Sequence, residues 1–256
     1  MPGDGLKKVV NAKNQFVPRH TDFSSPQRDE VDAYPDKRHP YTMLTINDIR
    51  TALEKRAHEP AEFRGHYTQA AVAMILADGE SSGQNGHESE LEVCFIRRAE
   101  RNGDPWSGQV AFPGGRAGPE DPDAHAVAER ETLEEIGLTL VENHRVGPLP
   151  IRPIDRADIR EAMTLSPFVY YVDQETKNTA FAKIPEEVAH VFWVPITHLF
   201  DETAVTELEY PIAETWSTFP GILFGEHVIW GLTLRVLDSF AEITQRTLPA
   251  LKGNHW

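Results

Sequence analysis

Three glutamates crowd into five positions of this sequence and are its strongest candidates for chemistry. Glu131, Glu134 and Glu135 lie in the run ERETLEEIGL of a chain whose formal net charge is already −15. Glu131 and Glu135 form a like-charge pair four residues apart, which destabilises a helix unless a partner neutralises it. A solvated acidic face is one explanation. A hard divalent cation is the other, because Mg²⁺ and Mn²⁺ prefer carboxylate, carbonyl and water oxygens as ligands.

A helix over residues 123–136 is predicted to carry the glutamates. Asp121 is a suitable N-cap with Pro122 at the first helical position, and Gly137 is a suitable end. Two of the glutamates then lie in the last turn, where the helix dipole disfavours negative charge. The glutamates therefore need a positive partner that the helix itself does not supply.

The turn before the helix is predicted to complete the site. The run FPGG, residues Phe112 to Gly115, could bring a backbone carbonyl to the glutamates. At about 100° per residue, the glutamates share an arc of roughly 100°, and a second arc is apolar. That second arc is predicted to pack on the core, and it holds Ala126, Leu133 and Ile136.

Apolar runs elsewhere predict a mixed α/β (α+β) fold without internal repeats. Strands over residues 69–77 and 91–96 are predicted to pair as a hairpin across a flexible loop, residues 78–90. Pro167 marks its strand as an edge strand or a bulge, because proline cannot donate a backbone hydrogen bond. Further strands are predicted over residues 110–112, 145–151, 164–172 and 188–194, and helices over residues 47–58 and 229–244.

The composition argues against several classes of protein. The chain has 40 acidic and 25 basic residues among 256, unlike the basic footprint of proteins that bind nucleic-acid polymers. Cys94 is its one cysteine, so neither a disulfide framework nor a cysteine-rich zinc site is expected. No apolar run approaches the ~20 residues of a membrane-spanning helix. We expect a cytoplasmic protein with a small-molecule partner, with mitochondria and peroxisomes as alternatives, and the oligomeric state is not readable.

The candidate site resembles a known signature. Gly115 followed by RETLEEIGL, residues 130–138, resembles the Nudix box, a Gly and an acidic residue followed by REUxEExGU with U aliphatic. Thr132 replaces one aliphatic residue, and Arg130 lies nine rather than eight positions after Asp121. That longer spacing, with FPGG ahead of it, is similar to the coenzyme A pyrophosphatase branch of the Nudix superfamily. Four further segments are similar to that branch in the same order: SGQVAFPGG, LSPFVYYV, EEVAHVFWVP and VIWGLTLRVL.

The resemblance implies a fold and a domain organisation. A Nudix domain is an α/β/α sandwich with a mixed β-sheet and a catalytic loop-helix-loop. The domain is expected over residues 44–248, with its core over residues 66–245. Residues 1–43 are expected to form an irregular N-terminal extension, and residues 249–256 a C-terminal tail.

The resemblance also implies metal-dependent hydrolysis of a pyrophosphate bond in a nucleoside diphosphate derivative. The favoured substrate is coenzyme A or an acyl-coenzyme A, giving 3′,5′-ADP and (acyl)phosphopantetheine. Arg130 is expected to orient the glutamates through a salt bridge. The expected ligands of Mg²⁺ or Mn²⁺ are Glu131, Glu134, Glu135 and the carbonyl of Gly115.

The general base is left open between two groups of glutamates. Glu131 and Glu135 are favoured, and the sequence does not choose between them. Some members of the family use a base from a loop elsewhere, and Glu186 and Glu187 are the candidates here. A solvated turn is the favoured interpretation of this loop pair.

Four residues around the glutamates are expected to contact the substrate. An arginine can hold a phosphate by paired hydrogen bonds, although each one here is equally well explained as a surface charge. Trp106 could stack on a base, with a core position as the favoured alternative. Arg152, Arg156 and Arg160 are spaced four apart and are expected to be solvated. The predicted substrate contacts are Arg97, Arg98, Arg116 and Phe112.

Two departures from the branch leave other substrates open. Asp104 stands where the branch carries an arginine, and Phe95-Ile96-Arg97 stands where it carries Leu-Leu-Thr. ADP-ribose, NADH or an oxidised nucleoside triphosphate is the alternative class of substrate. A Nudix-like module that binds nucleotides without hydrolysing them is a further alternative, although such modules typically lose a glutamate that this chain keeps.

Overall fold

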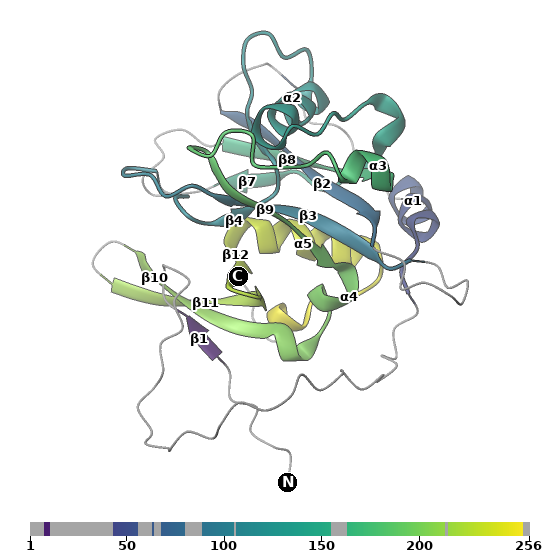
Figure 1. Ribbon diagram of the computed structural model, residues 1–256. Coiled ribbons are helices and arrows are strands. Elements are labelled where there is room, and N and C mark those ends of the chain that lie inside the picture. Colours follow the sequence, from purple (N-terminus) through teal and green to yellow (C-terminus); the bar gives the residue numbers. More distant parts are fainter. Residues whose placement is uncertain are drawn as a thin grey trace.

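The computed structural model of the chain contains two β-sheets with helices packed around them (Figure 1). The larger sheet has eight strands in the order β4-β3-β2-β8-β6, with β5 beside β2, β7 beside β8 and β9 beside β3. The smaller sheet has four strands in the order β1-β10-β11-β12. The structure describes residues 8–10, 43–55, 63, 68–79, 89–104, 106–154, 163–212 and 215–252.

The larger sheet is built from β2 (Gln69–Asp78), β3 (Leu91–Arg98), β4 (Val110–Ala111), β5 (Gly114–Arg116), β6 (Arg145–Pro148), β7 (Arg152–Ile154), β8 (Met163–Val172) and β9 (Val188–Pro195). The smaller sheet is built from β1 (Lys8–Val10), β10 (Val205–Ile212), β11 (Thr215–Phe224) and β12 (His227–Trp230). The α-helices are α1 (Ile46–Lys55), α2 (Ala124–Ile136), α3 (Gln174–Lys177), α4 (Ile196–Leu199) and α5 (Gly231–Ile243). Three 3₁₀ turns are η1 (Glu142–His144), η2 (Glu202–Ala204) and η3 (Pro249–Leu251).

The central strands of the larger sheet are buried on both faces. Successive side chains of a strand point to opposite faces. Met74 and Leu76 of β2 belong to one apolar cluster, and Ala73 and Ile75 belong to another. The first cluster includes residues of α5 and the second includes residues of α2, so these helices cover opposite faces of the sheet (Figure 1). This is the predicted α/β/α sandwich with a mixed sheet, since β2 pairs in parallel with β8 and antiparallel with β3.

The predicted pairing of β2 with β3 is confirmed, but the predicted edge strand at Pro167 is wrong. β2 and β3 are antiparallel, with Leu76 opposite Val93. β8, which contains Pro167, lies inside the sheet with β2 on one side and β6 and β7 on the other. Pro167 lies where the pairing passes from β6 to β7, and its carbonyl accepts the Leu149 N–H at 2.9 Å. The missing N–H of proline therefore falls at a gap between two partner strands.

Two predicted elements have different bounds in the structure. The strand predicted over residues 145–151 ends at Pro148 as β6, and a separate strand, β7, begins at Arg152. The C-terminal helix begins at Gly231 rather than at Ile229, which belongs to β12. Gly231 has a φ of 61°, a conformation that glycine adopts easily, and it turns the chain from the strand into the helix.

The predicted extension and tail lie largely outside the described residues. Within residues 1–43, Lys8–Val10 form β1 and pair in parallel with β10, so a strand occurs where irregular structure is predicted. Within the predicted tail, η3 contributes Ala250 to the core, with 3% of the residue exposed. Most of the predicted loop over residues 78–90 also lies outside the described residues. Among the residues that the structure describes, no helix is long and apolar enough to cross a membrane.

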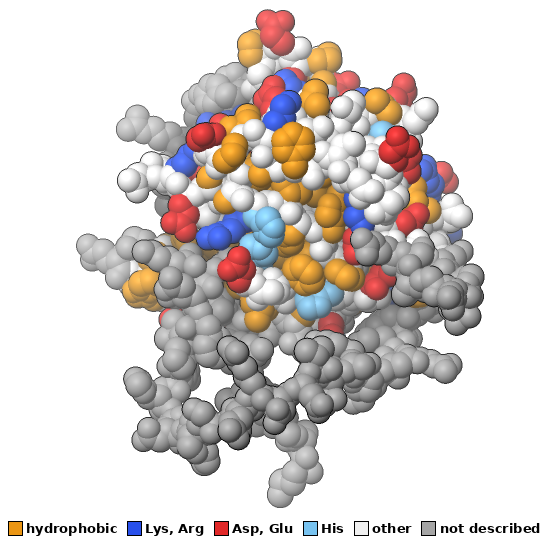
Figure 2. Space-filling view, viewed as in Figure 1, with side chains coloured by type: hydrophobic (Ala, Val, Ile, Leu, Met, Phe, Trp, Pro, Cys, Tyr) orange, Lys and Arg blue, Asp and Glu red, His pale blue; other side chains and the backbone are white. Residues whose placement is uncertain are grey.

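The charge of the chain is spread over its surface. Figure 2 shows acidic side chains interspersed with lysines and arginines on one face of the molecule, and histidines gathered near the middle of that face. The net charge of −15 is therefore not concentrated in a single acidic patch there. Burial and hydrogen-bond partners, rather than a charged patch, therefore distinguish the acidic residues that have a chemical role.

Candidate active site

Helix α2 carries the three glutamates, as predicted, but it begins later than predicted. Its N-cap is Asp123, whose carboxylate accepts a backbone N–H of the first turn at 2.8 Å. Gly137 ends the helix in the left-handed conformation, with a φ of 69°. The predicted N-cap, Asp121, is wrong because its carboxylate is bonded elsewhere. It accepts the N–H of Gly118 at 2.8 Å and the guanidinium of Arg130 at 2.9 Å.

The buried face of α2 differs from the predicted apolar arc. Ile136 is buried as expected, but Leu133 is 40% exposed, whereas Thr132 is fully buried and Glu135 is only 4% exposed. The Thr132 hydroxyl donates to the Ala128 carbonyl at 2.7 Å, which satisfies the buried hydroxyl. The helix therefore turns a carboxylate, rather than a leucine, toward the sheet.

The Gly-Gly turn of FPGG lies directly against two of the glutamates. The Gly114 N–H donates to Oε2 of Glu135 at 2.9 Å. A Cβ on Gly115 would lie 2.4 Å from Cδ of Glu131, closer than non-bonded atoms approach. Gly114 has a φ of 150°, and a Cβ there would lie 2.3 Å from the Ala71 carbonyl oxygen. Both positions need glycine so that the backbone can reach the carboxylates.

Arg130 joins the other carboxylates into one network. Its Nη1 donates to Oε1 of Glu131 at 2.8 Å and to Oε2 of Glu134 at 3.3 Å. Its Nε and Nη2 donate to the two carboxylate oxygens of Asp121 at 3.0 and 2.9 Å. Nη2 also donates to the Arg116 carbonyl at 3.2 Å. Arg130 thus supplies part of the positive charge that the glutamates need, and Asp121 fixes its position.

Burial makes the two glutamates nearest the turn hard to ionise. Burial raises the pKa of Glu135 to about 8, although the hydrogen bond from the Gly114 N–H opposes this rise. Burial also raises the pKa of Glu131, against the lowering effect of Arg130. The hydrogen bond from Arg130, by contrast, lowers the pKa of Asp121 below its ordinary value. Glu135 and Glu131 therefore ionise less readily than Asp121.

The oxygen donors at this site suit a hard divalent cation. Such ions take carboxylate and backbone carbonyl oxygens, and the absent side chain at Gly115 lets its backbone lie against the Glu131 carboxylate. Among the described residues, no three His, Cys, Asp or Glu side chains converge as metal ligands. The carboxylates of Glu131 and Glu134 do not converge on a common point because both are bound to Arg130. A cation would compete with Arg130 for these two carboxylates.

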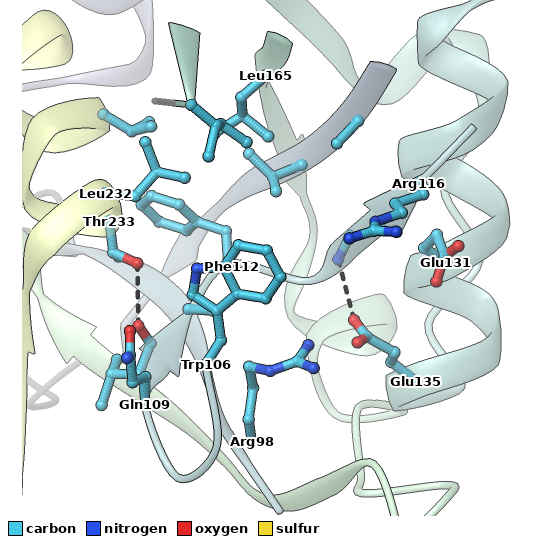
Figure 3. A pocket seen from close by; sticks show the side chains of 18 of the residues that line it. Arg98, Trp106, Gln109, Phe112, Arg116, Glu131, Glu135, Leu165, Leu232 and Thr233 are labelled. Carbon is cyan, nitrogen blue, oxygen red and sulfur yellow. Dashed lines mark hydrogen bonds between the residues drawn. The ribbon is translucent and has the colours of Figure 1, made fainter. Parts of the chain in front are cut away.

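A cavity of about 310 Å³ opens beside the carboxylates (Figure 3). Glu131, Glu135, Arg98 and Arg116 line one end of it. The other end is apolar and is formed by β7, β8 and α5. The aliphatic side chains there are Ile154, Met163, Leu165, Leu232 and Val236. In the part of the chain that the structure describes, the cavity therefore joins a charged end, suited to phosphates, to an end lined by aliphatic side chains.

Three of the four predicted substrate contacts line this cavity, namely Arg98, Arg116 and Phe112. Arg97 is not among its lining residues and instead binds Glu100, with Nη2 and Oε1 3.4 Å apart. Successive residues of β3 point to opposite faces of the sheet, which separates Arg97 from Arg98. The prediction of a substrate contact is therefore not supported for Arg97 in this arrangement.

The loop before β9 brings one of its two glutamates to the cavity. Glu187 lines the cavity and accepts from Nη2 of Arg101 at 3.2 Å. Glu186 is not a lining residue, and its carbonyl accepts from Nε of Arg101 at 2.6 Å. The Glu187 side chain is 44% exposed, so it is accessible to water as well as to the cavity. Of this pair, Glu187 is the one placed to act at the site.

Sequence reasoning missed or misjudged other residues near the cavity. Trp106 packs against the core, which is the favoured expectation, and it also lines the cavity. Arg152 is partly buried and its Nε donates to Oγ of Ser239 at 2.9 Å, so the prediction of a solvated arginine is wrong there. Arg156 and Arg160 lie outside the described residues. The aliphatic end of the cavity was not predicted. The one sequence feature that pointed to it was the segment VIWGLTLRVL, which contains its α5 residues and resembles the coenzyme A pyrophosphatase branch.

Residues 67–215 match the family model of the NUDIX domain. This chain belongs to the Nudix family. The match includes the FPGG turn, the glutamate helix and all strands of the larger sheet. As a Nudix hydrolase, the chain is an enzyme that acts on phosphoanhydride bonds, as predicted.

Relatives of this Nudix chain include coenzyme A diphosphatases. The mouse protein named mitochondrial coenzyme A diphosphatase NUDT8 is 34% identical over 211 residues, which cover 81% of this chain and 90% of that protein. The human protein of the same name is 32% identical over 150 residues, which cover 58% of this chain and 61% of that protein. Nudix hydrolase 22, chloroplastic, of Arabidopsis thaliana is 26% identical, covering 88% of this chain and 68% of that protein. The predicted similarity to the coenzyme A pyrophosphatase branch is confirmed.

Solved structures of Nudix proteins are more distant from this chain. A MutT/nudix family protein from Enterococcus faecalis is 15% identical with a TM-score of 0.46, covering 82% of this chain and 74% of that one. A mutT/nudix family protein from Listeria innocua is 22% identical with a TM-score of 0.39, covering 55% of this chain and 82% of that one. Neither likeness bears on the substrate.

Proposed function

We propose that this Nudix hydrolase cleaves the pyrophosphate bond of coenzyme A or an acyl-coenzyme A and depends on Mg²⁺ or Mn²⁺. The products would be 3′,5′-ADP and (acyl)phosphopantetheine. The observation that carries the proposal is the cavity with a charged end at Glu131 and Glu135 and an aliphatic end at α5. The names of the mouse and human NUDT8 relatives support it.

The cation would be held by the crowded carboxylates. The proposed ligands are Glu131, Glu134, Glu135 and the carbonyl of Gly115. A divalent cation bound there lowers the pKa of a coordinated water and neutralises charge on the phosphates. This explains why an acidic site can accept an anionic substrate, and the cation would favour the ionised form of Glu135, whose pKa burial raises.

The protein's own residues would orient the pyrophosphate and move one proton. Arg98 and Arg116 would hold phosphate oxygens at the charged end, since a guanidinium donates paired hydrogen bonds. The oxygen of a water bonds to one phosphorus, and the bond from that phosphorus to the bridging oxygen breaks. The water's proton passes to a carboxylate base, and the bridging oxygen leaves with the second phosphate. Glu131, Glu135 and Glu187 are the candidate bases, and the geometry does not choose among them.

The aliphatic end of the cavity favours a substrate with an extended, weakly polar arm. Aliphatic side chains from three separate elements form this end, and the Thr233 hydroxyl beside them already donates to the Val110 carbonyl at 2.9 Å. A ribose or a nicotinamide placed there would lose hydrogen bonds to water that the aliphatic side chains cannot replace. The pantetheine arm, and an acyl chain beyond it, would lose less. The arm is the part of coenzyme A that ADP-ribose and NADH do not have.

The test is a hydrolysis panel in which the products are resolved. Coenzyme A, acetyl-coenzyme A, ADP-ribose, NADH and 8-oxo-dGTP would each be incubated with Mg²⁺, with Mn²⁺ and with a chelator. Release of 3′,5′-ADP and a phosphopantetheine, abolished by the chelator, is the expected result. AMP from ADP-ribose or NADH, with coenzyme A untouched, would refute the proposed substrate but not the hydrolytic site.

A further inference from the structure

The loop between β3 and β4 carries an acid, Asp104, that binds two separate parts of the cavity wall. Its Oδ2 accepts from Nη2 of Arg98 at 2.7 Å, and its Oδ1 accepts the backbone N–H of Trp106 at 2.9 Å. Arg98 and Trp106 both line the cavity, whereas Asp104 does not. The Asp104 carboxylate therefore binds the Arg98 side chain and the Trp106 backbone without lining the cavity itself.

Arg98 has few other restraints among the described residues. It is the last residue of β3, next to an irregularity in the pairing of β3 with β9. Its Nε is buried and has no hydrogen-bond partner. Figure 3 shows its guanidinium beside the charged end of the cavity, on the same side as Glu135. An arginine in this state is short of an acceptor, and a phosphate oxygen in the cavity would provide one.

Asp104 is suited to hold this guanidinium in place. Its side chain is 17% exposed and that of Arg98 is 28% exposed, so water screens the pair only partly. Burial alone would raise the pKa of Asp104, but hydrogen bonds from Arg98 and the Trp106 N–H outweigh this and lower it. The carboxylate is therefore ionised when it binds Arg98. A long side chain that is already ordered loses less conformational freedom when it binds a ligand.

We propose that Asp104 is a positioning residue that fixes Arg98 for binding the pyrophosphate of the substrate. This inference rests on the proposed function for the presence of a pyrophosphate, but not on the identity of the groups attached to it. Asp104 acts through Arg98 and does not touch the substrate. Its removal therefore weakens substrate binding more than it slows the chemical step.

A purely structural role for Asp104 is the competing explanation. The backbone of Asp104 takes part in the turn, because the Ser107 N–H donates to its carbonyl at 3.1 Å. Asp104→Asn separates the two explanations, because an asparagine oxygen can still accept the Trp106 N–H while its NH₂ group cannot accept from Arg98. Glu100→Gln is the matched control. Glu100 lies on the same loop, loses the same charge, and pairs with Arg97, which is not a lining residue.

The experiment measures KM and kcat with Mg²⁺ for five variants beside the unaltered protein: Asp104→Asn, Asp104→Glu, Glu100→Gln, Arg98→Gln and the double variant Arg98→Gln/Asp104→Asn. Loss of an outer-shell partner typically costs 10–100-fold, so Asp104→Asn should raise KM about tenfold, with kcat within roughly twofold. Glu100→Gln should change neither. In the Arg98→Gln background, Asp104→Asn should have no further effect, because residues that act as a unit are not additive. Asp104→Glu should restore part of the lost affinity.

A binding measurement keeps the inference testable if coenzyme A is not the substrate. Calorimetry with inorganic pyrophosphate and Mg²⁺ should show about tenfold weaker binding for Asp104→Asn and unchanged binding for Glu100→Gln. Equal binding by Asp104→Asn and the unaltered protein would overturn the inference. An equal loss of affinity from Asp104→Asn in the unaltered protein and in the Arg98→Gln variant would also overturn the inference. Failure of the proposed function would appear differently, as absent coenzyme A hydrolysis by the unaltered protein.

Discussion

The backbone of Gly115 lies against the carboxylate of Glu131 with no room for a side chain between them. A Cβ on residue 115 would lie 2.4 Å from Cδ of Glu131 and 2.5 and 2.6 Å from its two oxygens. This contact joins the turn before α2 to the middle of the helix. It explains why the turn needs glycine at a position whose φ is not in the left-handed region.

Gly115→Ala should impair activity while leaving the fold nearly intact. The end of the Glu131 side chain is flexible, so it can move away from a new methyl group at small cost in stability. The moved carboxylate would no longer occupy its place beside Arg130 and the Gly115 backbone. We expect kcat/KM to fall by about tenfold or more, as for loss of a partner that orients a ligand. The melting temperature, measured in parallel by calorimetry, should change by only a few degrees, about 1 kcal/mol of stability.

Gly118→Ala is the matched control for this substitution. A Cβ there would lie 3.5 Å from Oδ2 of Asp121, which is ordinary van der Waals contact. This variant should keep both activity and stability. Equal activity of the two alanine variants would contradict a role for the close approach at Gly115.

The two glutamates that differ most in burial should respond differently to loss of charge. Glu134→Gln and Glu135→Gln should each reduce turnover by roughly 100-fold or more, because each removes a proposed ligand. Glu135 is 4% exposed, and a glutamine oxygen could still accept the Gly114 N–H. At neutral pH the folded protein holds a proton on Glu135 that the unfolded chain has released, which costs stability, because burial raises the pKa of Glu135 to about 8. Glu135→Gln removes this cost and should raise the melting temperature in the absence of cations. Glu134, with a side chain 51% exposed, should show little change in melting temperature.

Glu142→Gln serves as the control for these two variants, because Glu142 is exposed in η1 and is not a lining residue of the cavity. It should change neither turnover nor melting temperature. Full turnover by Glu134→Gln or Glu135→Gln in the hydrolysis assay would argue against the proposed metal ligands.

Asp121 should influence the affinity for the cation through Arg130. Its carboxylate binds both Nε and Nη2 of Arg130, and the same guanidinium binds Glu131 and Glu134. Asp121→Asn removes one charge and one of the two acceptors, so Arg130 would be held less firmly. A titration of turnover against Mg²⁺ concentration should show an apparent affinity altered by roughly 10–100-fold.

Asp123→Asn is the control for that titration. It is the same chemical change two positions away, at the N-cap of α2, where Asn and Asp are about equally favourable. An Mg²⁺ titration curve for Asp121→Asn that overlies the curve for Asp123→Asn would rule out the role given to Asp121.

The features of the site that the sequence predicts are those set by neighbouring residues. The run RETLEEIGL predicts a helix ended by Gly137, and FPGG predicts a backbone turn near its glutamates, because helix ends and turns depend on local residue types. The start of the helix was misjudged because Asp121 and Asp123 are both good caps, and only the tertiary contact with Arg130 takes Asp121 away.

The orientation of α2 and the aliphatic end of the cavity depend on residues far apart in the chain. Hydrophobicity favours burying Leu133, but the structure buries Thr132 and Glu135 instead. Their hydrogen bonds with Ala128 and Gly114 offset the cost of burying polar groups. The aliphatic wall meets only when β7, β8 and α5 pack together. No local pattern around the glutamates contains that information, so this half of the cavity could not be predicted.

One histidine, His227, should make the stability of the protein sensitive to acid. Nδ1 of His190 on β9 lies 3.0 Å from Nε2 of His227 on β12, so a hydrogen bond joins the two sheets. Burial lowers the pKa of His227, the charges of His190 and Arg97 lower it further, and Glu226 acts in the opposite direction. In the unfolded chain a histidine has a pKa of about 6.5. As the pH falls through that value, the unfolded chain binds a proton that folded His227 does not bind.

The free energy of unfolding should therefore fall as the pH drops below about 6.5, by up to about 1.4 kcal/mol per pH unit for this one proton. Urea denaturation of the unaltered protein and of His227→Gln, at several pH values from 7.5 to 5.5, measures the effect. His227→Gln should reduce the slope, because glutamine does not titrate and its amide can still bond to His190. His144→Gln, which alters a histidine of η1 away from the two sheets' junction, is the control. Equal slopes for His227→Gln and the unaltered protein would show that His227 does not cause the acid sensitivity.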